Sequence, residues 1–545
     1  MRMKNRITTM KASFFGALCL LSSCGLTYSC SDDYDLDETL PGFLGGSIYD
    51  ELKARDFKTV VKLVDDLEYS DVLSRTGSKT LFVAPDSAYA RFFATTDWVD
   101  ASGSPVRSYE QLTLSQKRIL LYNVLLNNAD VLEMLPYSAG GGSLTMRRNT
   151  AASSLDSVKY WQWNELPNNL NEPSEDDATG GDIRFWDAYT NQGRGGIYMA
   201  LDATAPMMLH FIEDQMKEKD ITHDDVSFIL GLRGDDAWLN GSAGGKRTYI
   251  YDARVIEQDV TCLNGYFNVL DKVVVTPSNM AEVIRTNGST NLFSQMLDRF
   301  SAPYYNASLT EQYKALYDIG NDSVFEKRYI SSRSHGGAIS ERPDRKDLGS
   351  FPLLSFDPGW NEYSGSNSLP KEQDMAAMFV PSDAAMEEYF LNGGGRALIE
   401  RFAKQTPVTR ENLSYNLYQI PLNIVQALIN NLMKDSFLES VPSKYLTIMN
   451  DAQDQMFPAT DPNYSSLEQY KESFERCLFA NNGVVYVMNR VMTPADYASV
   501  IAPVLYSRGT QIVNAVLRAD DNFIQENYNS APLQKYYSTY LKAMQ

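Results

Sequence analysis

The sequence FVAPDSAYARFF occupies residues 82–93, and FVPSDAAMEEYF occupies residues 379–390. Each copy begins with Phe-Val, has an Asp four positions after the Phe, and has an Ala two positions after the Asp. The apolar residues around each Phe predict a short strand, which the proline that follows ends because it has no N–H to donate. Aromatic and apolar residues then recur at helical spacing, so each copy predicts a strand, a turn and a helix.

An aspartate marks the predicted start of each helix. Asp86 directly follows Pro85, and Asp383 lies two residues after Pro381. A carboxylate at this position accepts hydrogen bonds from unpaired backbone N–H groups and interacts favourably with the helix dipole. We therefore expect each Asp to cap the helix that it begins.

Two further elements also occur twice. NGYFNVLDKVVVTP at 264–277 and NGVVYVMNRVMTP at 482–494 each predict an Asn-Gly turn followed by a strand that the proline ends. Amphipathic helices are predicted in the segments 56–73 and 291–300, before each copy of the first motif. The chain is therefore expected to use one structural unit twice.

In this order, the helix, F-V-x-x-D-x-A and N-G-x-x-x-V-x-(D/N)-x-V resemble the fasciclin-like domain. The resemblance covers most of residues 45–496. It implies an α+β fold with tandem fasciclin-like domains, each a β-sheet wedge packed with helices, and it implies a role in adhesion. Ala84 stands where the family usually has proline, and Asn268 and Tyr486 stand where it has a histidine. The motif residues are Phe82, Asp86, Ala88, Asn264, Gly265, Phe379, Asp383, Ala385, Asn482 and Gly483.

The two units differ in where extra chain is inserted. The first has about 80 residues inserted between its two motifs, and the second has its insertion before the Phe-Val motif, in polar sequence typical of long loops. The predicted organisation is a lipoprotein signal and lipidation site at 1–30, an acidic tether at 31–44, domain 1 at 45–278 with its insertion at about 137–246, domain 2 at 279–496 with its insertion at about 301–374, and a partial third repeat or helical cap at 497–545.

The N-terminus has the features of a secretory signal, with a basic start and a short apolar run. Leu21-Ser22-Ser23-Cys24 resembles a bacterial lipobox, whereas Cys30 precedes the acidic run Ser31-Asp32-Asp33-Tyr34-Asp35, which resembles a surface-export signal of Gram-negative lipoproteins. We favour Cys30 as the lipidated residue, with Cys24 as the alternative. The expected location is the outer membrane, with the lipid-anchored protein facing the exterior.

The net charge and the histidine and cysteine residues narrow the range of possible functions. With 49 Lys+Arg against 69 Asp+Glu, the net charge of −20 argues against nucleic acid as a partner. His210, His223 and His335 have no metal-ligand spacing, and Thr222 is expected to cap a helix that starts at His223. We expect no catalytic residue, metal site or cofactor, and we expect Cys262 and Cys477 to be buried free thiols.

Aromatic residues cluster in the first insertion. Trp161, Trp163, Trp186 and Tyr189 lie among polar residues. Such side chains either stack on sugar rings as a ligand platform or fill a small core, since aromatic residues bury large areas. Both interpretations remain open from sequence.

Two functions are therefore expected. The first is a surface-exposed lipoprotein that binds protein or matrix partners through fasciclin-like domains. The alternative is an accessory lipoprotein of an outer-membrane uptake complex, which holds a glycan or docks on a TonB-dependent transporter. An exposed tryptophan platform would favour the alternative, and buried tryptophans would favour the first function.

Overall fold

The computed structural model describes residues 45–494, except for 76, 138–143, 154, 156–157, 168–184, 187–188, 190–194, 201–206, 233–246, 335–338, 340, 344–346, 350, 361–371 and 451–452. The expected signal segment, the two candidate lipidation cysteines, the tether, the region 497–545 and His335 lie outside this part of the chain. Within it, no helix is long and apolar enough to cross a membrane.

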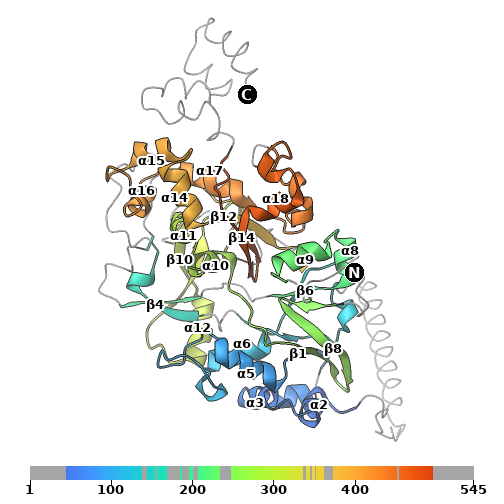
Figure 1. The fold of residues 1–545 in the computed structure, drawn as a ribbon. Helices are drawn as coiled ribbons and strands as arrows, with labels where there is room; N and C mark the ends of the chain where they lie inside the picture. Colours follow the sequence, from blue (N-terminus) through green and yellow to red (C-terminus); the bar gives the residue numbers. More distant parts are fainter. Residues whose placement is uncertain are drawn as a thin grey trace, which may run out of the picture. The chain divides into compact units, whose positions relative to one another are not determined.

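The described chain has an α+β fold with three sheets (Figure 1). The first sheet has the order β2 (Leu125–Leu126), β1 (Lys79–Val83), β9 (Gly265–Leu270), β8 (Ala253–Cys262), β7 (Tyr249–Ile250), β6 (Met207–Phe211) and β3 (Arg147–Asn149). The second has β10 (Ser301–Tyr305), β11 (Val324–Tyr329), β5 (Gly196–Ala200) and β4 (Val158–Gln162). The third has β13 (Met433–Lys434), β12 (Ala376–Pro381), β15 (Gly483–Met488) and β14 (Phe474–Ala480).

Both copies of the Phe-Val motif form the predicted strand and helix. Strand β1 is followed by α5 (Asp86–Thr95), and β12 is followed by α14 (Asp383–Leu391). The motif Phe of each copy, Phe82 or Phe379, is buried in the core because it points from the strand into the apolar side of the sheet. The motif Ala is also buried, one turn into the helix.

The two Asn-Gly strands lie in equivalent places. Strand β9 runs parallel to β1 with Phe82 opposite Asn268, and β15 runs parallel to β12 with Phe379 opposite Tyr486. The order β2-β1-β9-β8 in the first sheet therefore matches β13-β12-β15-β14 in the third. Both strands end six residues or more before the predicted proline stops, since β9 ends at Leu270 and β15 at Met488.

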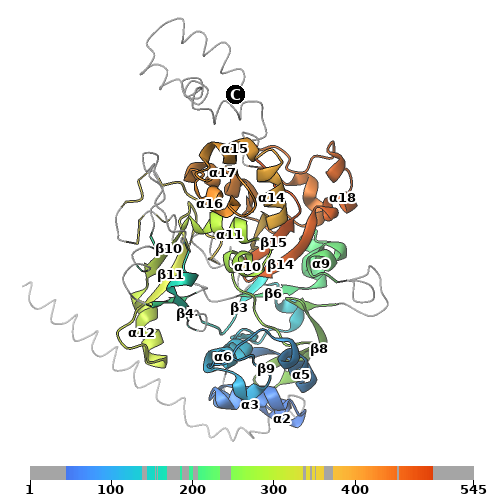
Figure 2. The ribbon, with the colours of Figure 1, turned by 60° about the vertical axis from the view of Figure 1, so that its left-hand side comes forward.

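The insertions build structure that the sequence pattern did not indicate. The first insertion supplies β6 and β3, which extend the first sheet beyond β7. It also supplies β4 and β5, and β5 pairs in parallel with β11 from the second insertion. The second sheet therefore combines strands from both insertions, with α12 (Ala307–Leu316) beside β11 (Figure 2). The second insertion is not only loops, because it contains β10, α12 and β11.

Helices accompany the first and third sheets in two groups (Figure 1). The first group contains α2 (Ile48–Ala54), α3 (Lys58–Asp66), α4 (Ser70–Arg75) and α6 (Leu114–Tyr122), whereas α8 (Glu213–Glu218) and α9 (His223–Ile229) lie apart from it, with α9 in contact with β14. The second contains α10 (Met280–Thr286), α11 (Asn291–Asp298), α15 (Arg396–Phe402), α16 (Leu413–Tyr418), α17 (Leu422–Leu432) and α18 (Leu467–Glu472). The predicted amphipathic helices before each Phe-Val motif are α3 and α11, and their apolar faces are buried.

Candidate functional site

The motif aspartates cap a different helix from the one predicted. Asp86 Oδ1 accepts a hydrogen bond from the N–H of Thr59 at 2.8 Å, and Asp383 Oδ1 accepts one from Leu292 at 2.8 Å. These N–H groups belong to the first turns of α3 and α11, so each carboxylate joins two helices of its repeat. The prediction that each Asp stands at a helix start and accepts unpaired N–H groups is confirmed, but these N–H groups belong to α3 and α11, while α14 is capped by Ser382 and α5 has no side-chain cap.

The motif asparagines make a second matched contact. Asn264 Oδ1 accepts from the N–H of Ile48, the first residue of α2, at 2.9 Å, and Asn482 Oδ1 accepts from Met280, the first residue of α10, at 2.9 Å. The amide of Asn482 also donates to the carbonyl of Pro358 at 2.7 Å. Each Asn therefore satisfies an N–H that a helix start leaves without an intrahelical partner.

The glycine after each Asn allows close strand pairing. Gly265 has φ +141°, and a Cβ there would lie 1.9 Å from the carbonyl oxygen of Lys79. A Cβ on Gly483 would lie 2.4 Å from the carbonyl oxygen of Ala376. The Asn-Gly pair is thus explained by helix capping and backbone contact, and the motif residues are structural in both copies.

The positions where the fasciclin-like family has histidine are internal in this protein. Asn268 and Tyr486 are both fully buried. The Tyr486 ring stacks on Phe379 with a centroid separation of 5.1 Å. Neither residue offers a surface group to a partner.

The two histidines in the described part of the chain, His210 and His223, contact neighbouring side chains of the fold. His210 is buried in β6 with Nδ1 3.2 Å from the Gln215 side-chain oxygen, and burial lowers its pKa to about 3, so the ring is neutral. Thr222 caps α9 as predicted, and His223 Nε2 lies 2.8 Å from Glu213 Oε1. No group of three or more His, Cys, Asp or Glu in the described ranges could hold a metal ion. Cys262 and Cys477 are free thiols, and burial raises the pKa of Cys262 to about 12.

The tryptophan cluster does not form a platform. Trp161 and Trp186 are buried in a small core with Leu166, Ile197 and Met199, and Tyr189 packs against this core. The indole N–H of Trp186 donates to the Ser301 carbonyl at 3.0 Å, which fixes the ring inside. Only Trp163, with 51% of its surface exposed, faces solvent. The core interpretation is correct for Trp161 and Trp186, because the sheet shared by the two insertions covers them.

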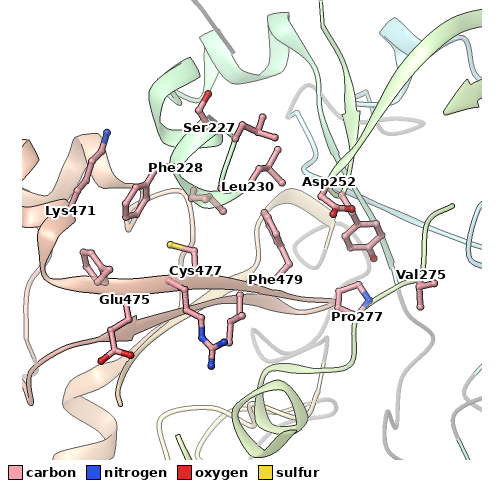
Figure 3. Close-up of a pocket in the computed structure, with 17 residues that line it drawn as sticks. Ser227, Phe228, Leu230, Asp252, Val275, Pro277, Lys471, Glu475, Cys477 and Phe479 are labelled. Atoms are coloured by element: carbon pink, nitrogen blue, oxygen red, sulfur yellow. The ribbon is translucent and has the colours of Figure 1, made fainter. Parts of the chain in front are cut away.

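A cavity with mixed polar and apolar walls lies where the first insertion meets the third sheet (Figure 3). It has a volume of about 600 Å³, and α9 with the turn after it forms one wall. The strand β14 forms the opposite wall, and residues from the β7–β8 turn and from the chain after β9 close one end. Phe228 contacts Phe474 across this junction with a centroid separation of 6.0 Å.

Hydrogen bonds tie each wall to another segment of the chain, α9 to Ser443 and the end of β14 to Ser278. The Asp225 carboxylate of α9 accepts from the N–H and the hydroxyl of Ser443, both at 2.7 Å. The N–H of Asn481, directly after β14, donates to the carbonyl of Ser278 at 3.1 Å. The cavity therefore lies between the first insertion and the second repeat, and its volume falls in the range of ligand sites.

Sequence reasoning did not identify this site. Its walls come from segments more than 200 residues apart, and the residues of β14 show no motif. The one local signal was the helix start at Thr222, which correctly located α9 but did not indicate its partner.

Comparisons with known proteins add little. A scan against protein-family models finds no match, and a search of curated proteins finds none either. Among solved structures, a FAS1 domain pair from the insect cell adhesion molecule Fasciclin I matches with a TM-score of 0.23 and 9% sequence identity, over 83% of this chain and 100% of that chain. A likeness this weak decides nothing about the fold, which is α+β with an internally repeated four-strand arrangement.

Proposed function

We propose that this chain is a surface-exposed lipoprotein whose two fasciclin-like repeats bind a protein partner. The observation that carries the proposal is the cavity between α9 and β14, which is lined by both apolar and charged side chains. The sequence features of a signal and lipidation site, with Cys30 favoured over Cys24, support a location outside the cytoplasm. The motif resemblance supports an adhesive or interaction role in place of catalysis.

The alternative role in glycan or nutrient uptake has less support. It depended on an exposed platform of Trp161, Trp163 and Trp186, and two of these rings are buried. Docking on a TonB-dependent transporter requires no such platform, so that partner is retained as one outcome of the test below.

The test is affinity capture of the full lipoprotein from its own outer membrane in mild detergent, with mass spectrometry of the proteins that copurify. Leu230 points into the cavity (Figure 3), so Leu230→Trp fills it, and Leu316→Trp on α12, an exposed site on another surface, is the matched control. We expect wild type and the control to retain a stoichiometric partner that Leu230→Trp loses. Capture of no partner by the wild type would refute the proposal, and capture of a TonB-dependent transporter would favour the alternative.

The lipid anchor is tested separately by metabolic labelling with a fatty acid. We expect Cys30→Ser to lose the label and Cys24→Ser to retain it. The opposite pattern would assign lipidation to Cys24, and label on neither wild type nor variants would remove the anchor from the proposal.

A further inference from the structure

The cavity follows the outer edge of β14. Every residue from Phe474 to Phe479 lines it. Successive residues of a strand point to opposite faces, so a cavity that contacts all of them must run along the edge of the strand. Figure 3 shows Cys477 and Phe479 directed towards α9, whereas Glu475, next to the register shift between Phe474 and Arg476, is directed away.

This edge has no strand beside it in the described part of the chain. Strand β14 pairs with β15 on one side and is the last strand in its sheet. Its residues 477–480 pair with β15 in unbroken register, so their outward N–H and C=O groups form a regular row. Such a row is a template for another extended segment.

The equivalent strand of the first repeat is partly protected, by an added strand at its start and by irregular register further along. The outer edge of β8 pairs with β7 at Arg254 and Ala253. The register of β8 against β9 also shifts twice, and Asp259 within the second shift has φ +55°. Bulges and added strands are how sheets block edge pairing. Strand β14 has one register shift, next to Phe474, and no added strand.

The side chains around the edge favour an apolar residue next to an acidic one. Phe228, Leu230 and Phe479 offer an apolar recess beside the strand. The Arg476 guanidinium donates only to neutral acceptors, which are Asn287 and the Ser289 hydroxyl. The Lys471 ammonium has a distant partner, Asp224, at 3.9 Å.

The strand also carries one anion. The Glu475 carboxylate accepts a hydrogen bond from the neutral Ser382 hydroxyl at 2.5 Å and keeps its negative charge. Arg476 has no carboxylate partner in the described part of the chain, so a carboxylate on the incoming segment would pair with it locally.

We propose that β14 binds an extended segment of a partner protein by strand addition. The segment pairs its backbone with residues 477–480, inserts one large apolar side chain between α9 and β14, and places an Asp or Glu near Arg476. Backbone hydrogen bonds then supply affinity and the recess supplies specificity. This inference rests on the proposed protein-binding function and specifies its partner chemistry.

The test uses a phage-displayed library of seven-residue peptides selected on the full lipoprotein in detergent. We expect enriched peptides to combine an apolar residue with an acidic residue one to three positions away. Arg476→Glu should weaken their binding at least tenfold, Arg476→Lys should restore most of it, and Arg396→Glu, an exposed charge reversal on α15, should change it less than twofold. Each variant is shown to be folded by an unfolding midpoint equal to that of the wild type.

Two measurements identify the binding mode. Amide hydrogen exchange should slow at residues 477–480 when the selected peptide binds, and N-methylation of alternate peptide amides should abolish binding for one set of positions only. Equal binding to Arg476→Glu, or unchanged exchange at 477–480, would overturn strand addition.

Two outcomes separate this inference from the proposed function. If the native partner is still captured by Arg476→Glu, the inference fails and the function stands, whereas capture of no partner by wild type removes the function. Dimerisation that protects the same amides would assign the edge to a second copy of this chain and also overturn the proposal.

Discussion

The two repeats have the same internal contacts but end their sheets differently. Asp86 and Asp383 join equivalent helices, and Asn264 and Asn482 cap equivalent helix starts. Beyond this common part, the first sheet continues through β7, β6 and β3, whereas the third ends at β14. The shared contacts explain why the motifs occur twice, and the difference at the edge determines where a partner strand could pair.

The largest expected effect on stability concerns the two motif glycines. It separates the cost of a steric clash from the cost of backbone strain. Gly265→Ala and Gly483→Ala should each lower the free energy of unfolding by about 3 kcal/mol or more, since the added Cβ would clash with a neighbouring carbonyl in both repeats. The measurement is equilibrium unfolding in urea. Gly103→Ala is the control, because Gly103 has φ +82° but open space around it, and it should cost about 1 kcal/mol. A Gly265 variant no worse than this control would contradict the close-contact explanation.

A pH dependence from a buried carboxyl at the start of the motif strand is expected in the second repeat and not at the equivalent position of the first. Burial raises the pKa of Asp374 to about 6, and the register places Gly77 at the equivalent position of the first repeat. Because the folded state holds this proton more tightly, the contribution is present below the ordinary pKa and is lost as pH rises through about 6. The loss amounts to roughly 3 kcal/mol.

Asp374→Asn keeps an acceptor for the N–H groups of Met375 and Leu438 while removing the titration. Urea unfolding of wild type and variant from pH 4 to pH 8 should show the variant gaining relative stability as pH rises. A difference between the two proteins that does not change with pH would show that Asp374 stays charged in the folded protein.

Replacing each of the two motif asparagines by alanine should lower the free energy of unfolding by unequal amounts. Asn482 is fully buried and bonds both Met280 and Pro358, so Asn482→Ala leaves buried groups unpaired and should cost about 2–3 kcal/mol. Asn264 is half-buried, and Asn264→Ala should cost about 1–2 kcal/mol because water can replace part of the lost contact. Chemical denaturation of both variants measures the difference. Equal losses would mean that burial does not distinguish the two repeats.

The smallest expected effect concerns the motif aspartates. Asp86→Asn and Asp383→Asn retain an acceptor but remove the charge at the starts of α3 and α11, at a cost of about 0.5–1 kcal/mol each. Unfolding at low and at 0.5 M salt should show that salt reduces the difference from wild type. A loss above about 3 kcal/mol in one repeat only would break the equivalence of these contacts.

Local pattern was sufficient for much of the fold. The strand and helix after each Phe-Val motif, the amphipathic helices α3 and α11, and the cap at Thr222 follow from periodicity and turn residues within short segments. The ends of β9 and β15 were placed too late, because the apolar run before each proline continues past the last strand pair. The candidate site could not be predicted, since its two walls come from segments distant in the sequence that meet through tertiary contacts such as that between Phe228 and Phe474.

The sequence by itself determined that one helix–strand unit occurs twice, because motif spacing and hydrophobic periodicity are local properties of the chain. Only the tertiary structure decided which helix each Asp caps, whether Trp161 and Trp186 are core or surface, and which strand edge stays open. The physical reason is that hydrogen-bond partners, burial and strand neighbours depend on segments distant in sequence. The pairing of β5 with β11, which joins two separate insertions, is the clearest instance.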